Sequence, residues 1–364
     1  MTGEGIRSLL FVPGDREDII LKALASAADA VIIDLEDAVA PDRKAAARQV
    51  TRQVLDQAER GGKAVFVRLN AFDTGLTATD AAAVLGGRPW GVVLPKAHGP
   101  TEVARLSHML DALEAREAVE AGTTRILTVA TETAAATLSL AAPGGEGQER
   151  LWGMLWGGED LAAALGAMAN RDAEGHYTFP YRFARSQCLY AANAAGVAAV
   201  DAVYTDFRDP AGLEAEVRAA LRDGFVAKAA IHPAQVEIIN RVLTPDDGQL
   251  DWARRVVELL ADRGVARLDG RMVDIAHKRI ALRLLSRAAA LEAAGSRRPA
   301  EAGISGGVRR RRASPPVSIN VDQPFMAGRT EDGRGAVETA SCSVDDAPCQ
   351  PDRARRAGER VSCG

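Results

Sequence analysis

Residues 31–58 read VIIDLEDAVAPDRKAAARQVTRQVLDQA, and this stretch contains the pattern that decides the fold. A short apolar run at 31–33 is followed at once by an acidic segment at 34–37 and then, at 44–58, by a segment of helical period. A buried strand, a polar turn and an amphipathic helix are the parts of one βα unit, in which helices cover the faces of a parallel sheet.

The same unit recurs along most of the chain. Apolar runs that predict strands occupy residues 9–12, 31–33, 65–67, 92–94, 126–129, 154–156, 200–203 and 225–231. Segments of helical period lie between them, for example at 19–28, 102–115 and 211–222. Eight units over about 235 residues have the size of a (β/α)8 TIM barrel, so we predict an α/β fold of this class. An open doubly wound sheet is the alternative.

Polar residues follow the predicted strands. In a barrel the carboxyl ends of all strands lie on one rim, where barrel enzymes place their chemistry. The rim residues are Pro13, Gly14, Asp34, Glu36, Asp37, Arg68, Asn70, Lys96, Glu132, Glu159, Asp160, Asp206 and His232. Because most of them are ionisable, we expect an active site on this rim.

Composition excludes several classes of protein. No apolar run approaches the roughly 18 residues that cross a bilayer, and the first residues lack a signal-peptide layout, which predicts a cytoplasmic protein with no membrane partner. Residues 295–364 hold 12 arginines and 9 acidic residues, so the rest is more acidic than the net charge of −4 suggests. An acidic body argues against nucleic-acid binding. The 4 cysteines and 5 histidines have no zinc-site spacing, so carboxylates are the expected ligands of any metal.

We expect three parts along the chain. The barrel is assigned to residues 1–240, and a C-terminal helical extension or lid to 241–294. Residues 295–364 are rich in Pro, Gly, Ser and Arg with little periodicity. Such a segment cannot offset its ordering entropy by burial, so it is predicted to be a disordered low-complexity tail.

Two carboxylates stand out as candidate metal ligands. Glu132 ends the run ILTVAT, and Asp160 follows the next run in MLWGGE. Acids on neighbouring strand ends can share one Mg²⁺, with water and substrate oxygens completing its octahedron. We favour Asp160 over Glu159 because the site calls for one inward carboxylate. The alternative is that these acids only cap the helices that follow.

Basic residues near the first strands are candidates for anion binding. Arg68 ends a predicted buried strand, and its planar guanidinium suits a carboxylate or an oxyanion beside the metal. A structural ion pair with an acid at 34–37 is the alternative, and both can hold together. A second group lies near the first two strand ends, where it could bind phosphate or form a solvated surface: Lys22, Arg43, Lys44 and Arg48.

Nine collinear segments resemble the citrate lyase β-subunit-like branch of the HpcH/HpaI aldolase superfamily, of the malyl-CoA and citramalyl-CoA lyase type. They are LLFVPG (9–14), DLEDAVAP (34–41), VRLN (67–70), LPK (94–96), TET (131–133), GGEDL (157–161), VYTDFRD (203–209), GFVAKAAIHPAQ (224–235) and GRMVD (270–274). The resemblance covers about residues 6–290.

The resemblance implies a TIM barrel that binds Mg²⁺, with Mn²⁺ as a substitute, through Glu132 and Asp160. It places Arg68 at the substrate carboxylate and carbonyl, and makes Asp274 the catalytic acid/base that reaches the site from a neighbouring subunit of a homotrimer or dimer of trimers. It implies that the CoA moiety lies along Phe11, Lys22, Arg43, Lys44, Arg48, Ile231 and His232.

The expected activity is cleavage, or the reverse condensation, of a short 3-hydroxyacyl-CoA such as malyl-, methylmalyl- or citramalyl-CoA. The products of cleavage are a 2-oxo acid and an acyl-CoA. The alternatives are a malyl-CoA thioesterase, a CoA-independent aldolase, and a citrate lyase β-type subunit that acts with an acyl carrier. Two segments depart from the family pattern: Ala134, Ala135 and Ala136 stand where relatives often have a glycine, and Asp18 stands where relatives carry a second cation.

Overall fold

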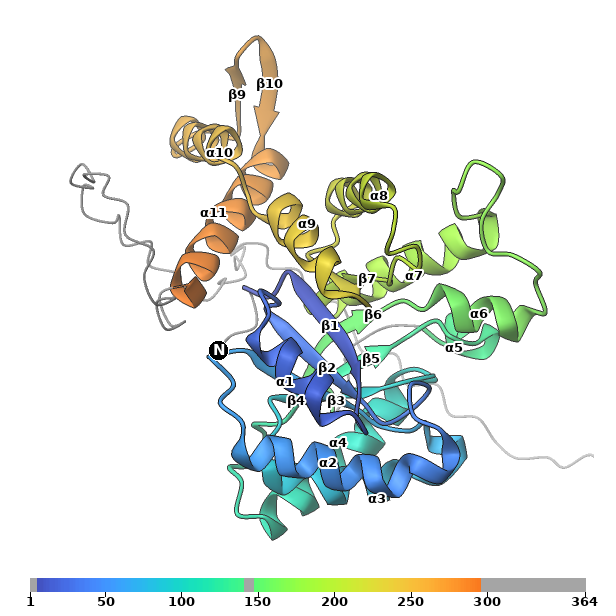
Figure 1. The fold of residues 1–364 in the computed structure, drawn as a ribbon. Helices are drawn as coiled ribbons and strands as arrows, with labels where there is room; N and C mark the ends of the chain where they lie inside the picture. Colours follow the sequence, from blue (N-terminus) through green and yellow to red (C-terminus); the bar gives the residue numbers. More distant parts are fainter. Residues whose placement is uncertain (1–4, 141–146, 296–364) are drawn as a thin grey trace, which may run out of the picture. The chain divides into compact units, whose positions relative to one another are not determined.

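The computed structural model describes residues 5–140 and 147–295, so the predicted tail lies outside the described residues apart from Gly295. In this part of the chain, eight parallel strands close into a barrel (Figure 1). They are β1 (Ser8–Pro13), β2 (Ala30–Asp34), β3 (Ala64–Arg68), β4 (Gly91–Leu94), β5 (Arg125–Val129), β6 (Leu151–Leu155), β7 (Ala198–Asp201) and β8 (Ala227–Ala230). Because β1 pairs with both β2 and β8, the predicted barrel is confirmed and the open sheet is wrong.

Helices surround the barrel between successive strands (Figure 1). They are α1 (Glu17–Ala25), α2 (Lys44–Gln57), α3 (Thr77–Val84), α4 (Pro100–Arg116), α5 (Ala134–Leu138), α6 (Gly158–Leu165), α7 (Phe179–Ala194), α8 (Pro210–Asp223) and α9 (Pro233–Leu243). Local chemistry sets the ends of α8: Asp209 caps its first turn, Pro210 occupies the first helical position, and Gly224 ends it with a φ of 113°.

Strand alternation decides which side chains enter the barrel. In β2 and β3, Ala30, Ile32, Ala64 and Phe66 belong to the interior cluster, whereas their neighbours in sequence pack against the helices. Since side chains along a strand alternate with a period of two, the last residues of these strands, Asp34 and Arg68, also face inward. The carboxyl ends of β2 and β3 therefore place a carboxylate, Asp34, and a guanidinium, Arg68, at the mouth of the barrel.

Aromatic rings fill the opposite end of the barrel. Phe66 packs against Trp90 and Trp152 with ring centroids 4.9 and 5.3 Å apart. Gly91 makes room for this packing, because a Cβ at this position would lie 2.9 Å from Phe66 Cε1. The interior is thus a packed core, and the rim is the end of the barrel left for chemistry.

The C-terminal region contains α10 (Asp247–Leu259), the antiparallel hairpin β9 (Val265–Leu268) and β10 (Arg271–Asp274), and α11 (Ile275–Gly295). Helices were predicted here, but the hairpin was not. Its turn is Asp269-Gly270, with φ values of 48° and 80°, and Asp-Gly is a common hairpin signal that could have revealed it. The proposed boundary at residue 240 falls inside α9, and a separate domain from 241 stays a prediction.

Helix α11 contacts the barrel at the end opposite the rim. Arg287 Nη2 donates a hydrogen bond of 2.6 Å to the carbonyl of Val226, the residue before β8. The N-terminal ends of parallel barrel strands lie away from the rim, so this part of α11 does too. None of the helices in the described ranges is both long and apolar enough to span a membrane.

Candidate metal centre at the barrel rim

Arg68 is held by two acids of the β2 segment. Its Nε and Nη2 donate to the two carboxylate oxygens of Asp34 at 2.7 and 2.6 Å, and its Nη1 lies 3.0 Å from Glu36 Oε2. The Arg68 side chain is 12% exposed, so the guanidinium is fixed in a partly dry environment. Burial opposes its charge, but Asp34 and Glu36 prevail and raise the pKa of Arg68 above its usual value.

Asp34 also shapes the turn that follows β2. Its two oxygens accept hydrogen bonds from the backbone N–H groups of Glu36 (2.8 Å) and Ala38 (2.9 Å). Burial alone would raise the pKa of Asp34, yet Arg68 and these N–H groups lower it below the usual range. For Glu36 burial wins over Arg68 and Lys96, and its pKa is raised. Both alternatives considered for Arg68 are therefore compatible: it forms a structural pair and still faces the mouth of the barrel.

Glu132 is a buried carboxyl beyond β5, with 3% of its surface exposed. Its Oε2 accepts a hydrogen bond of 2.6 Å from the backbone N–H of Lys96. Burial raises its pKa to about 8, with further contributions from the charges of Asp160 and Glu36 that Arg68 offsets only in part. A carboxyl in this environment favours either a proton or a cation.

Asp160 lies in the first turn of α6, and its charge acts on Glu132. Gly157, the residue before this helix, packs closely on Glu132, because a Cβ at residue 157 would lie 2.6 Å from Glu132 Cγ. Asp160 Oδ1 is 3.4 Å from the ammonium of Lys96. The adjacent Glu159 instead accepts a hydrogen bond from Asn170 at 2.8 Å. This geometry favours Asp160 over Glu159 as the acid that accompanies Glu132.

Lys96 is a site residue to which the sequence had assigned only a place on the rim. Its ammonium lies 2.7 Å from Glu36 Oε1 and 3.4 Å from both Asp37 Oδ2 and Asp160 Oδ1. Its φ of 50° is uncommon for a residue with a side chain. Burial lowers its pKa, but the surrounding carboxylates outweigh burial and raise it. A single lysine after a strand carries no specific signal, which is why its role was missed.

The rim carries more negative than positive charge. Among the described residues, the acids in this cluster are Asp34, Glu36, Asp37, Glu132 and Asp160, and their cationic partners are Arg68 and Lys96. No described group of three or more His, Cys, Asp or Glu side chains is arranged as a complete metal site. Two carboxylates in a cluster with excess negative charge fit Mg²⁺, which usually keeps several waters and takes one or two protein carboxylates.

Three of the residues expected along CoA lie on the β1 and β8 side of the rim. Phe11 of β1 lies beneath Arg68, whose guanidinium carbon is 5.1 Å from the ring centroid. Ile231, which follows β8, is 42% exposed. His232 caps α9, and its ring stacks on Phe207 with centroids 5.0 Å apart. Ile231 and His232 are exposed and Phe11 is partly buried, so a ligand that enters from this side can contact the first two directly.

Lys44 and Arg48 are used inside the protein. Lys44 Nζ donates to the carbonyls of Leu35 and Glu36 and to Asn70 Oδ1, at 2.7–2.8 Å. Arg48 Nε donates to the fully buried Asp80 at 2.6 Å. A CoA phosphate would have to compete with these partners, so the geometry gives both side chains a clear role in supporting the loop after β2.

Lys22 and Arg43 are more accessible. Lys22 is 79% exposed, with its Nζ 4.0 Å from Asp18, and Arg43 Nε lies 3.3 Å from Asp15. Exposed pairs of this kind are weak, so these cations can exchange their partners for a phosphate at small cost. Asp18 reduces the local positive charge, as its position in the sequence predicted.

Asp274, at the end of β10, lies in the C-terminal region. Its Oδ1 is 2.7 Å from His277 Nδ1 and accepts a hydrogen bond from the Ala276 N–H. These contacts, with His277 first, lower the pKa of Asp274. Within the described residues, the side chain of Asp274 contacts only nearby residues of its own segment. It forms no hydrogen bond with the acids at the rim of the same chain.

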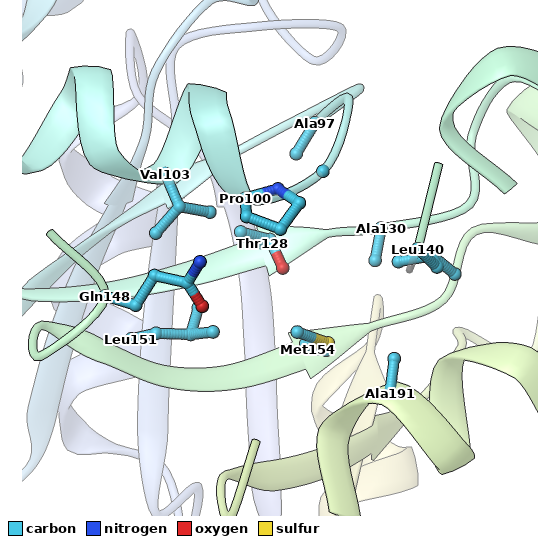
Figure 2. A pocket seen from close by; sticks show the side chains of 11 residues that line it. Ala97, Pro100, Val103, Thr128, Ala130, Leu140, Gln148, Leu151, Met154 and Ala191 are labelled. Atoms are coloured by element: carbon cyan, nitrogen blue, oxygen red, sulfur yellow. The ribbon is translucent and has the colours of Figure 1, made fainter. Parts of the chain in front are cut away.

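A small cavity lies elsewhere, between α4 and strands β5 and β6 (Figure 2). Val103, Thr128, Leu151 and Met154 line it, and its volume is about 20 Å³. This space holds about one water molecule. The cavity is therefore a packing defect of the helical layer and no substrate site.

Known proteins match both the sequence and the structure. A family model described as HpcH/HpaI aldolase/citrate lyase matches residues 7–233. A (3S)-malyl-CoA thioesterase of Cereibacter sphaeroides is 35% identical over 295 residues, covering 80% of this chain and 97% of the relative. A citrate lyase subunit beta-like protein of Mycobacterium tuberculosis is 39% identical over 266 residues, covering 73% and 89%.

A solved structure extends the similarity. The protein CitE of Mycobacterium tuberculosis, in complex with magnesium, acetoacetate and coenzyme A, matches with a TM-score of 0.64 and 34% identity. The match covers 79% of this chain and 99% of that chain. It therefore includes more of the chain than the barrel matched by the family model.

Proposed function

The chain belongs to the HpcH/HpaI aldolase/citrate lyase family, and we propose from this premise that it is a Mg²⁺-dependent CoA-ester lyase. Its substrate would be a short 3-hydroxyacyl-CoA such as malyl-, methylmalyl- or citramalyl-CoA, cleaved to a 2-oxo acid and an acyl-CoA or formed from them. One observation carries the proposal: at the rim the charge of Asp160 acts on the buried carboxyl of Glu132, and the nearby charge of Arg68 offsets this effect only in part. The relative solved with magnesium, acetoacetate and coenzyme A supports it.

Glu132 and Asp160 would hold the Mg²⁺ ion, and Mn²⁺ could substitute for it at the same site. When bound, the ion supplies a Lewis acid for the oxygens of the oxo-acid half. Arg68 would place its fixed charge beside the substrate carboxylate and the oxygen that gains charge. Its fork is already oriented by Asp34, so little reorganisation is needed when the substrate binds.

Proton transfer at carbon is assigned to Asp274. In cleavage the 3-hydroxyl releases its proton to solvent, its oxygen becomes the carbonyl of the 2-oxo acid as the C–C bond breaks, and the electron pair of this bond passes to the thioester enolate. Asp274 in its protonated form then gives the enolate carbon a proton. In condensation the Asp274 carboxylate removes this proton. Among the residues that the structure describes, the hydrogen-bond contacts of this carboxylate are all at Oδ1, which leaves Oδ2 for the substrate.

Asp274 would act on the rim of a neighbouring subunit. Arg287 of α11 is anchored at the far end of the barrel, and Asp274 lies 13 residues earlier, or about 20 Å along a helix. Large apolar side chains are exposed around it: Val265, Met272, Ile275, Ile280 and Leu282. A second copy that covers this surface would complete the site, in a homotrimer or a dimer of trimers.

The CoA moiety is proposed to lie along Phe11, Ile231 and His232, with its phosphates near Lys22 and Arg43. The exposure of Ile231, His232, Lys22 and Arg43 supports this group, and Phe11 is partly buried below Arg68. Lys44 and Arg48 are kept in the proposal as supports of the loop that the ligand crosses, because both are bound to protein oxygens.

A thioesterase is the second candidate, favoured by the relative that is 35% identical and named (3S)-malyl-CoA thioesterase. In this reaction water attacks the thioester carbonyl and the C–C bond stays intact. A citrate lyase β-type subunit that receives its substrate from an acyl carrier is a third reading, which the relative from Mycobacterium tuberculosis supports.

Product analysis tests the proposal. The purified chain is incubated with Mg²⁺ and each of the three thioesters, and products are identified by mass spectrometry, with EDTA replacing Mg²⁺ in the control. A lyase yields a 2-oxo acid and a shorter acyl-CoA, whereas a thioesterase yields the free hydroxy acid and CoA. Turnover that persists in EDTA would refute the metal-dependent mechanism.

A further inference from the structure

Lys96 is surrounded by carboxylates in a way that resembles an ion in a binding site. Among the described residues its ammonium contacts Glu36 Oε1 at 2.7 Å and both Asp37 Oδ2 and Asp160 Oδ1 at 3.4 Å. These oxygens come from the loop after β2 and from the first turn of α6, which follows β6 on the other side of the closed barrel. The side chain of Lys96 is 25% exposed, so it is only partly solvated.

Asp160 links this cluster to the proposed metal centre. It faces Lys96 directly, and its charge also acts on Glu132. In two-metal enzymes the ions lie about 3.5–4 Å apart, and carboxylates are shared between them. Here Asp160 is shared in the same way: its charge acts on Glu132 on one side, and on the other side it contacts the Lys96 ammonium together with Glu36 and Asp37.

The backbone of Lys96 holds its side chain there. Its N–H donates to Glu132 Oε2 at 2.6 Å, and its φ is 50°. Lys96 thus contacts both proposed metal ligands: Glu132 through its backbone N–H and Asp160 through its ammonium. A mobile surface lysine would not combine these contacts with a position between three acids.

We propose that Lys96 takes the place of a second metal ion and thereby limits the rim to one divalent cation. The inference rests on the proposed metal centre and adds to it the residue that determines its stoichiometry. Without this ammonium, Asp37 and Asp160 would lose the cation that they contact and Glu36 would keep only Arg68, a deficit of positive charge that a second divalent ion can fill. The positive charge of Lys96 also repels such an ion at short range.

Mn²⁺ binding tests the inference without an activity assay. Free Mn²⁺ is counted by electron paramagnetic resonance during titration of the wild type and of Lys96→Met. We expect one tightly bound Mn²⁺ per wild-type chain and two per Lys96→Met chain. Lys63→Met is the matched control, because Lys63 contacts the carbonyl of Ser26 and lies before β3, away from the rim. This control is expected to bind one ion.

A double variant identifies the second position. Lys96→Met combined with Glu36→Gln removes an acid that the second ion requires, and we expect the count to return to one. Lys96→Arg keeps a positive charge and is expected to bind one ion. Lys96→Gln serves as a second neutral variant if the methionine disturbs folding, which circular dichroism would reveal.

The possible results are distinguishable. A wild type that binds no Mn²⁺ refutes the metal centre itself. One ion in the wild type and one or none in a folded Lys96→Met or Lys96→Gln refutes the role of Lys96 alone. If both neutral variants fail to fold while Lys96→Arg folds, Lys96 is a folding residue and the inference is also overturned.

Discussion

At the scale of single residues, the rim depends on buried charges that compensate one another. The side chain of Asp34 is only 1% exposed, and both of its carboxylate oxygens accept hydrogen bonds from Arg68. Breaking a buried pair by removing one partner typically costs about 3–5 kcal/mol, because the remaining charge stays in a poorly solvated place. Changes at this pair therefore affect both stability and chemistry, and the measurements must separate the two.

Arg68→Lys keeps the charge but removes the planar fork. A lysine cannot bind both Asp34 oxygens and also face Glu36, so its charge will no longer be fixed beside the substrate. We expect kcat/KM for the thioester to fall by about 10²–10³-fold, as for other lost oxyanion donors, while Mn²⁺ binding persists. Steady-state kinetics and Mn²⁺ titration measure the two effects.

Arg105→Lys is the control for this substitution. Arg105 is an exposed residue of α4 that lies over the ring of Phe72, away from the acid cluster. It should leave kcat/KM unchanged. Equal losses in the two variants, or a normal kcat/KM for Arg68→Lys, would remove Arg68 from the mechanism.

The protonation of Glu132 predicts a pH dependence of stability. Without metal, burial and then the charges of Asp160 and Glu36 raise its pKa from 4.5 to about 8. Between these values the folded chain binds more protons than the unfolded chain, so the free energy of unfolding falls as pH rises. Glu132→Gln cannot ionise. In EDTA we expect the wild type to lose thermal stability relative to Glu132→Gln from about pH 4.5 to about 8.

Thermal unfolding over this pH range measures the difference between the two proteins. Mg²⁺ should reduce or reverse it, because the ionised Glu132 then gains a cation that Gln cannot bind as well. A difference between the two melting temperatures that is independent of both pH and Mg²⁺ would show that Glu132 does not titrate in this way.

At the scale of secondary structure, the site is made by loops that follow β2, β4, β5 and β6. Each loop brings one kind of group: acids after β2, Lys96 after β4, Glu132 after β5 and Asp160 after β6. These segments can meet because all strands of a parallel barrel end on the same rim. Gly157, which precedes α6, allows its loop to reach Glu132.

Gly157→Ala tests this close approach. The added Cβ would lie 2.6 Å from Glu132 Cγ and 3.3 Å from Val129 Cγ1, so Glu132 must move. A shift of this kind in a two-carboxylate site should weaken Mn²⁺ binding by at least about tenfold, as loss of support for metal ligands typically does.

Gly248→Ala is the matched control, since Gly248 is exposed in the first turn of α10. It should bind Mn²⁺ like the wild type. Unchanged Mn²⁺ affinity in Gly157→Ala would mean that the loop can retreat without moving the acid. The spacing between α6 and Glu132 would then be unimportant for the metal.

At the scale of the whole molecule, the question is how Asp274 reaches a rim. Its own α11 is anchored near the start of β8, while the proposed metal ligands lie at the other end of the strands. A site shared between subunits predicts that two inactive chains can complement each other. Glu132→Gln retains Asp274, and Asp274→Asn retains a complete rim.

Co-expression of these two variants should restore activity. If the chains mix at random and every site uses one rim and one Asp274 from a neighbour, about one quarter of the wild-type activity is expected. Co-expression of Glu132→Gln with Asp160→Asn is the control, because every rim is then defective. The activity of the purified mixed oligomers is measured, and no recovery above either variant alone would exclude a shared site.

Much of this protein could be derived from its sequence. The eight βα units, the order of the strands and the rim acids were predicted because hydrophobic periodicity is a local property that each segment expresses by itself. We predicted rim positions for Glu132, Asp160 and Arg68, because residues at or just after the ends of barrel strands lie on the rim. The hairpin of the C-terminal region was missed because its strands have four residues each and are largely exposed.

Only the tertiary structure decided how the rim charges are paired. Lys96 contacts Glu36, which is 60 residues away in the sequence, and Glu132, which is 36 residues away. Lys44 and Arg48 turn inward, where Lys44 binds the carbonyl of Leu35 and Arg48 binds the carboxylate of Asp80. Such partners depend on side-chain direction, burial and backbone angles such as the positive φ of Lys96. These quantities arise when distant segments pack together, so no local pattern contains them.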